Sequence, residues 1–154
     1  MTAKKTGKFK SRSIIINNPE EIKIACVISE WHNEITESFY NAAFTKLVEL
    51  GVLEKNIDKI YVPGSFELIF ATKNLIDKDY DAIISMGCII KGETKHFDFV
   101  CSGTAQGIMD LNIHGNVPVI FCVLTDNNMQ QAIERSGGIH GNKGTEAAVA
   151  ALKM

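Results

Sequence analysis

The sequence has 154 residues, of which 45% are hydrophobic and 22% are charged, and these values predict a single globular domain with its own core. Its formal net charge of −2 argues against nucleic acid as the main partner, because a phosphate backbone is bound by a surplus of Lys and Arg. No apolar run approaches the roughly 20 residues that cross a bilayer, and no apolar stretch follows the first lysines, so we expect a cytoplasmic protein without a membrane span.

Residues 1–12 form a basic stretch, which we interpret as a flexible N-terminal arm in front of one domain over residues 13–154. An arm that binds nucleic acid or cargo is the alternative, because the stretch is rich in cations. The cationic residues are Lys4, Lys5, Lys8, Lys10 and Arg12.

The first half of the domain alternates strand-like apolar runs with a segment of helical period. Three consecutive isoleucines predict a short edge strand at 13–17, and the run KIACVIS predicts a buried strand at 23–29. Apolar side chains that recur every three and four residues predict a helix at 35–50, which Gly51 ends. A further strand is predicted at 57–62.

The second half continues the same alternation after the break at Pro63-Gly64. We expect a helix at 65–78, a strand at 81–90, a helix at 96–111, a strand at 117–124, and two short helices at 128–135 and 142–153 joined by Ser136-Gly137-Gly138.

This order of elements predicts an α/β fold, namely a flavodoxin-like three-layer sandwich. Its parallel four-stranded sheet would carry helices on both faces, with the N-terminal edge strand in addition. Ligands bind such sheets beyond the carboxyl ends of the strands, so four loops become candidates for a site. These loops are residues 30–33, 63–67, 91–96 and 125–128.

The loop at 91–96 runs from a buried strand into a helix, and the free N–H groups and dipole of such a helix start favour an anion. Gly92 would let the backbone approach a ligand, and Thr94 can cap the helix or donate its hydroxyl. His96 falls in the first turn, where we expect a neutral imidazole able to exchange protons. A surface histidine without a catalytic role is the alternative.

Other residues of interest have both a structural and a functional interpretation. Trp31 can stack on a flat ligand or pack against the next helix. Glu67 can accept hydrogen bonds from a ligand or complement a helix dipole, with Ser65 as a cap. Phe121 lies inside a strand and favours core packing, and Arg135 is either a dipole partner or a phosphate clamp.

The usual marks of nucleotide and metal sites are absent from the sequence. No G-x-G-x-x-G or G-x-x-x-x-G-K-[ST] pattern opens a helix, and there is no metal-spaced His pair. The cysteines form no C-x-x-C pair, so we interpret them as small buried hydrophobic residues of a reducing compartment and expect no metal. They are Cys26, Cys88, Cys101 and Cys122.

Five motifs, in this order, resemble the lumazine synthase family over residues 23–153. The matching pieces are Trp31 at a strand end, Pro63–Glu67, Gly92–Phe97, Val117–Phe121 with Val123–Thr125, and Gln131–Arg135 followed by Gly141–Gly144. Trp31-His32 stands where Phe-Asn is common in the family, and Ile139 stands where the family has a lysine.

The resemblance implies a transferase without metal or organic cofactor, in riboflavin biosynthesis. Such an enzyme condenses 5-amino-6-(D-ribitylamino)uracil with 3,4-dihydroxy-2-butanone 4-phosphate to give 6,7-dimethyl-8-ribityllumazine, phosphate and water. His96 would be the catalytic proton-transfer residue. The implied binding residues are Trp31, Ser65, Phe66 and Glu67 around the ring and ribityl chain, Cys88, Ile89 and Ile90 along the wall, and Glu93 and Thr94 at the phosphate.

The resemblance also implies a site shared between subunits. Phe121 on the ring and Arg135 on the phosphate would come from the adjacent subunit, with Lys143 in the same wall. The family forms homopentamers, and many members build an icosahedral 60-subunit shell. Riboflavin synthase would be a further protein partner.

Three alternatives remain at this point. The archaeal type of riboflavin synthase shares the fold but dismutates two lumazines. A non-catalytic flavin-binding or shell protein could use the same scaffold, although His96, Thr94 and Arg135 together argue against it. A flavodoxin-like electron carrier would need bound flavin.

Overall fold

The computed structural model describes residues 13–154. The basic residues Lys4, Lys5, Lys8, Lys10 and Arg12, and the arm predicted at residues 1–12, lie outside the described part of the chain. No helix within residues 13–154 combines the length and apolar character that crossing a bilayer requires.

A sheet of four parallel strands forms the centre of the domain, as the sequence predicts. The strands are β1 (Ile24–Ser29), β2 (Ile57–Val62), β3 (Ala82–Ile90) and β4 (Val119–Asp126), in the order β2-β1-β3-β4. β1 and β3 are apolar on both faces and almost completely buried, as expected for the centre of a parallel sheet.

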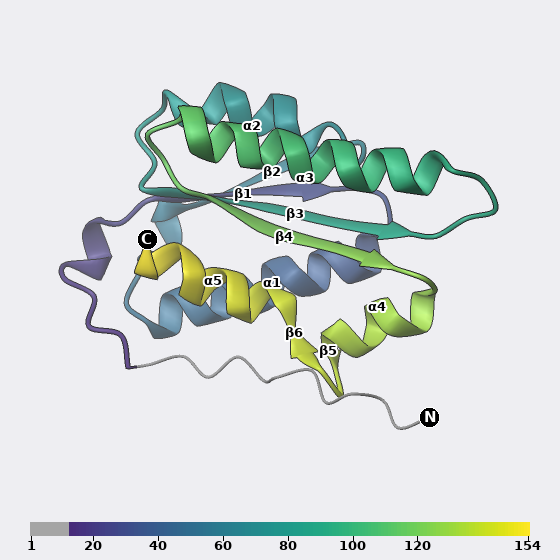
Figure 1. Cartoon of the computed structure of the whole chain (residues 1–154). Coiled ribbons are helices and arrows are strands. Elements are labelled where there is room, and N and C mark those ends of the chain that lie inside the picture. Colours follow the sequence, from purple (N-terminus) through teal and green to yellow (C-terminus); the bar gives the residue numbers. More distant parts are fainter. Residues whose placement is uncertain (1–12) are drawn as a thin grey trace.

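Helices cover both faces of the sheet and complete the three-layer sandwich (Figure 1). α2 (Leu68–Ile76) and α3 (His96–His114) lie on one face, and α1 (Asn33–Glu49) and α5 (Lys143–Lys153) lie on the other. α4 (Met129–Arg135) lies on the α1 face near the carboxyl ends of the strands. The flavodoxin-like α/β fold is therefore confirmed.

Each face of the sheet has its own apolar core. Ile28 and Met86 pack under α1 and α5, whereas Val27 and Ile83 pack under α2 and α3. α5 approaches α1 so closely that a β-carbon on Gly144 would lie 1.9 Å from the carbonyl oxygen of Phe39. Glycine is therefore required at this helix contact.

The predicted edge strand at 13–17 is wrong for the described chain, in which these residues form no strand. Ile15 is 91% exposed, and no strand within residues 13–154 pairs with this segment. The segment enters the fold through the 3-10 turn Pro19–Glu21, and a second such turn, Glu54–Asn56, precedes β2.

Two further differences have local causes. The helix predicted from residue 65 begins at Leu68, because Ser65–Glu67 form a turn. The link between the last two helices is a small antiparallel hairpin, β5 (Ser136–Gly138) and β6 (Gly141–Asn142). Gly137 and Gly141 adopt positive φ angles of 116° and 81° there, a conformation that glycine accepts without strain.

Candidate active site

The strand order reverses between β1 and β3, and we refer to the carboxyl edge of the sheet at this point as the crevice. The chain leaves β1 to form β2 on one side and then returns to form β3 on the other, which is the arrangement in which ligands bind at strand carboxyl ends. Backbone hydrogen bonds fix the loops there: Glu30 N donates to Val62 O at 2.8 Å, and Lys91 N donates to Asp126 O at 2.9 Å. The strands point toward these loops in Figure 1.

Trp31 and Glu67 meet at Gly64 on one side of this crevice. A β-carbon on Gly64 would lie 3.3 Å from Trp31 Cδ1 and 2.8 Å from Glu67 Oε2, so glycine makes room for both. Trp31 N donates to Pro63 O at 3.3 Å, yet its side chain is 69% exposed. The indole therefore does not pack into the core, and its surface is available to a flat ligand.

Ser65 and Phe66 continue this wall toward α3. Ser65 is buried, and its Oγ has no hydrogen-bond partner within the described residues. A β-carbon on Gly87 would lie only 2.5 Å from that Oγ, so β3 supports the loop from below. The Phe66 ring rests on Gly103 of α3, and half of the side chain stays exposed.

The segment from Lys91 to His96 forms the opposite side, and all six residues are exposed. Thr94 Oγ1 accepts a hydrogen bond from His96 N at 3.3 Å, and a β-carbon on Gly92 would meet no atom within 4 Å. His96 is the first residue of α3 and lies seven residues before Gly103, about 10 Å along the helix from the Phe66 ring. Glu93 is exposed in the same loop.

Cys88, Ile89 and Ile90 form the end of β3 and pair with the end of β4. Cys88 and Ile89 are buried in the two cores, so these residues present mainly backbone and the half-buried Ile90 to the crevice. Burial, and secondarily the Asp126 carboxylate, raises the pKa of the Cys88 thiol to about 12. This cysteine is therefore a packing residue and not a thiolate nucleophile.

Within the described residues, no hydrogen bond or ion pair joins three residues of the predicted site to the loops around the crevice. Phe121 pairs with Ser85, five residues before the end of β4, which is about 16 Å along the strand. Arg135 ends α4, where its Nη1 donates to Gln131 O at 3.0 Å. Lys143 begins α5 and pairs with Glu146 at 3.3 Å.

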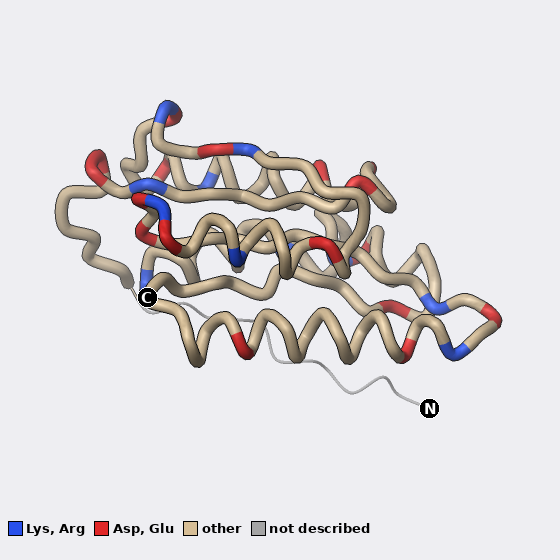
Figure 2. Tube along the Cα trace, turned by 90° about the horizontal axis from the view of Figure 1, so that it is seen from above, with Lys and Arg blue, Asp and Glu red and all other residues tan. Residues whose placement is uncertain are grey.

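Phe121 lines an apolar hollow at the surface. Its position inside a strand had favoured packing in the core, which the structure does not show. The side chain is 38% exposed on the edge strand, beside Met109 and Ile113 of α3. The hollow has a volume of about 430 Å³. α3 has 19 residues, and apart from its histidines the only acidic or basic ones are Asp98 and Asp110. In Figure 2 this long helix accordingly shows few charged positions, in contrast to the charged loop that precedes it.

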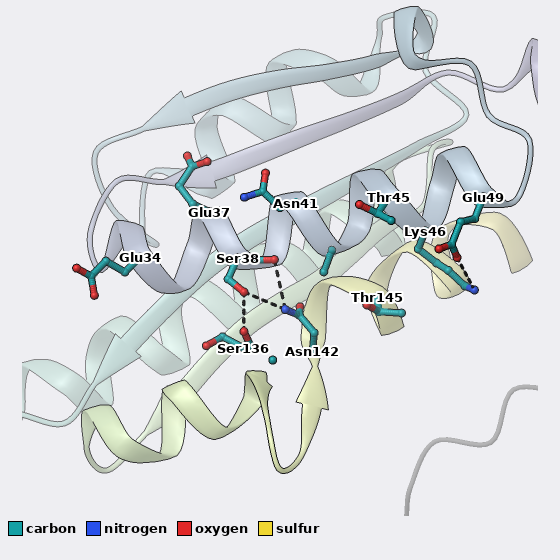
Figure 3. A pocket seen from close by; sticks show the side chains of 12 residues that line it. Glu34, Glu37, Ser38, Asn41, Thr45, Lys46, Glu49, Ser136, Asn142 and Thr145 are labelled. Atoms are coloured by element: carbon teal, nitrogen blue, oxygen red, sulfur yellow. Dashed lines mark hydrogen bonds and ion pairs between the residues drawn. The ribbon is translucent and has the colours of Figure 1, made fainter.

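A second hollow, about 620 Å³, lies elsewhere, between α1 and the β5–β6 hairpin (Figure 3). Ser38 Oγ donates to Ser136 O at 2.6 Å and accepts from Asn142 Nδ2 at 3.0 Å. These bonds attach the hairpin to α1 and use the central polar groups internally. None of the predicted site residues lines this hollow.

One residue near the crevice escaped the sequence reasoning. Asp126 ends β4, is only 6% exposed, and its Oδ2 has no partner within residues 13–154. Burial raises the pKa of this carboxyl, and the nearby Arg135 guanidinium lowers it in part. The available signal was an acidic residue two positions after the apolar run at 117–124.

The residues near the crevice offer hydrogen bonds and stacking but no evident metal site. No group of three or more His, Cys, Asp or Glu within residues 13–154 is arranged to hold a metal ion. All four cysteines are free thiols.

Comparison with known proteins gives a family for this arrangement. The family model described as 6,7-dimethyl-8-ribityllumazine synthase matches residues 21–154. The chain belongs to this family. It is similar to three curated proteins of that name: from Flavobacterium johnsoniae (57% identity, 90% of this chain and 74% of the relative), Christiangramia forsetii (55%, 90% and 84%) and Flavobacterium psychrophilum (54%, 90% and 74%).

Proposed function

We propose that this protein condenses 5-amino-6-(D-ribitylamino)uracil with 3,4-dihydroxy-2-butanone 4-phosphate to give 6,7-dimethyl-8-ribityllumazine, phosphate and water. The observation that carries the proposal is the family match over residues 21–154, which includes every loop of the crevice. The reaction needs two substrates held in register, an anion site for the departing phosphate and one group that moves protons. Positioning alone can supply several orders of magnitude of rate.

The aminouracil substrate occupies the side of the crevice formed by Trp31 and Ser65–Glu67. The exposed indole stacks on the pyrimidine ring, and the Phe66 ring closes the pocket against α3. Glu67, directed by Gly64 toward Trp31, accepts hydrogen bonds from the ribityl chain or ring. The ends of Cys88–Ile90 supply backbone groups to the wall.

The phosphate substrate binds at the start of α3. Glu93 and Thr94 lie next to the free N–H groups of this helix, whose dipole favours an anion. His96 occupies the first position of the helix and is exposed, so its imidazole is accessible to a substrate amine or carbonyl. It serves as the proton-transfer group, a role worth about 10² to 10⁴ in rate.

A neighbouring copy of the chain completes the pocket with Phe121, Arg135 and Lys143. The position of Phe121, about 16 Å along β4 from the crevice of its own chain, supports this arrangement. The apolar hollow around Phe121 also favours contact with another protein surface, because exposed apolar patches mark interfaces. The assembly is a homopentamer that can build a 60-subunit icosahedral shell, with riboflavin synthase as a partner in the cytoplasm.

Incubation with both substrates tests the function, with lumazine formation followed by fluorescence. His96→Ala should slow turnover by about 10² to 10⁴ without abolishing it, and His114→Ala, at the other end of the same helix, should retain full activity. Equal rates for His96→Ala and the parent would remove His96 from the mechanism. Supplying lumazine alone distinguishes a riboflavin synthase, which would form riboflavin from it.

Mixing two impaired variants tests the shared site. If His96 and Arg135 act across a boundary, refolding His96→Ala together with Arg135→Ala in equal amounts gives about a quarter of sites with both groups intact. Activity should then exceed that of either variant alone. Absence of any gain in mixed assemblies would place both groups in one chain. Light scattering on the same samples measures the number of subunits.

A further inference from the structure

Asp126 is a buried carboxylate without an obvious purpose in the fold. It is 6% exposed, and its Oδ2 has no hydrogen-bond partner within residues 13–154. Its backbone oxygen accepts from Lys91 N, so the residue is fixed at the carboxyl edge of the sheet. A buried, unpartnered charge is costly, and such a group persists in a fold where it serves another residue.

The cation whose charge acts on the Asp126 carboxyl is that of Arg135. The other titratable group beside Asp126 is the thiol of Cys88 on β3, which burial keeps neutral. Side chains on a helix point back toward its N-terminus, and Arg135 follows this rule, because its Nη1 reaches Gln131 O one turn earlier. The guanidinium is therefore directed along α4 toward the end of β4, where Asp126 lies.

Arg135 is also the residue that we place on the substrate phosphate of the adjoining site, and the inference rests on that proposed function. Within residues 13–154 the guanidinium forms no ion pair at 4 Å or less. It can therefore pair with either of two anions. One is the fixed carboxylate of Asp126, and the other is the phosphate that arrives with substrate and leaves as product.

We propose that Asp126 is a positioning residue that competes with phosphate for the Arg135 guanidinium. When the site is empty, the Asp126 carboxylate attracts the guanidinium toward the end of β4 without forming an ion pair with it. When phosphate is bound, the carboxylate opposes part of its attraction to Arg135. The consequence is weaker binding of phosphate, and hence easier release of the product, than Arg135 alone would give.

The test is the affinity for inorganic phosphate, measured by calorimetry and as inhibition against the butanone phosphate. Asp126→Asn removes the charge and keeps the shape, so phosphate should bind about fivefold more tightly, a factor of the size expected for a partly exposed charge-assisted contact. The KM for the butanone phosphate should fall similarly, while the KM for the aminouracil stays unchanged. Unchanged or weaker phosphate binding would overturn the proposal.

Two controls separate this role from a structural one. Asp77→Asn, an exposed acid at the end of α2, should leave phosphate binding unaltered. In an Arg135→Ala background Asp126→Asn should have no effect on phosphate binding, because the competition is then absent. An effect of the same size in that background would refute the coupling. Asp126→Ser, which also removes the charge, supplies a second variant if the first is poorly folded.

Failure of the reaction and failure of this inference are distinguishable. If the parent protein forms no lumazine from both substrates, the proposed function is wrong, yet calorimetry with phosphate still measures the coupling between Asp126 and Arg135. If the parent is active and Arg135→Ala binds phosphate as the parent does, the role of Arg135 fails, and the competition fails with it.

Discussion

Gly87→Ala should displace the loop Ser65–Glu67, because Gly87 of β3 lies directly beneath Ser65. The added β-carbon would lie 2.5 Å from Ser65 Oγ and 3.1 Å from Leu68 Cδ1, both in the buried layer beneath α2. Ordinary contact begins at about 3.4 Å, so Ser65 must move by about 0.9 Å, the difference from 2.5 Å. Because Ser65 leads directly into Phe66 and Glu67, the movement is passed to the ring-binding wall.

The magnitude follows from the size of this shift. Overpacking of a buried site costs about 2 kcal/mol of unfolding free energy, which lowers Tm by about 4 to 8 °C in a chain of this length. A displacement of about 1 Å at a substrate-positioning loop costs up to about a hundredfold in rate. We therefore expect kcat/KM for the aminouracil to fall by about 10- to 100-fold, in assays well below the new Tm.

A second substitution, Ser65→Ala, should relieve the steric clash that Gly87→Ala creates. Ser65→Ala alone should be nearly neutral for stability, because its Oγ has no partner to lose within the described residues. In the double variant the closest atoms become Leu68 Cδ1 at 3.1 Å and the residue 65 β-carbon at 3.3 Å, which need to move only by a few tenths of an ångström. Most of the lost stability and rate should return. A double variant no better than Gly87→Ala would refute the steric explanation.

Three further predictions concern stability and reactivity. Gly144→Ala should cost at least about 3 kcal/mol in urea unfolding, since the new β-carbon would lie 1.9 Å from the backbone of α1; an unchanged midpoint would contradict this. Burial raises the pKa of Glu37, but hydrogen bonds from Lys59 and Tyr61 outweigh it and lower the pKa overall. Its contribution to stability is therefore present above about pH 4.5 and lost as the pH falls through the folded-state pKa, so Glu37→Gln should destabilise at pH 7 and not at pH 3. Burial first, and Asp126 second, raises the pKa of Cys88 to about 12, so Cys88 should resist alkylation at pH 8 in the native protein, and rapid labelling seen by mass spectrometry would disprove this.

The regular elements could be predicted because their apolar patterns are strong. β2 has the predicted bounds, 57–62, and β1 and β3 differ from prediction by one residue at one end. β4 begins and ends two residues later than predicted, and the side chain of Asn112 binds the backbone at its first residue: Oδ1 accepts from Val119 N at 2.8 Å and Nδ2 donates to Val119 O at 2.9 Å. A side-chain contact with the backbone seven residues away leaves no periodic signal.

The site was predictable only in part, for a similar reason. The rule that ligands bind at strand carboxyl ends leads to Trp31 and His96, and the structure places both at that edge. The close approaches at Gly64, Gly87 and Gly103 were not predicted, because only coordinates reveal them. The hairpin at 136–142 was missed because its strands are too short for an alternating pattern.

The register of the sheet, together with the exposure of Phe121, supports a site shared between subunits. β4 cannot slip along β3, because a shift of one residue would turn the buried side chains of Cys122 and Leu124 to the face on which Phe121 and Thr125 are exposed. The pairing of Phe121 with Ser85 is therefore fixed, and no loop movement can bring Phe121 to the crevice of its own chain. If Phe121 contacts the substrate ring at all, it does so in a neighbouring copy. A folded monomer would then bind the aminouracil only through Trp31 and Phe66, so dissociation of the assembly should abolish activity while the fold remains intact.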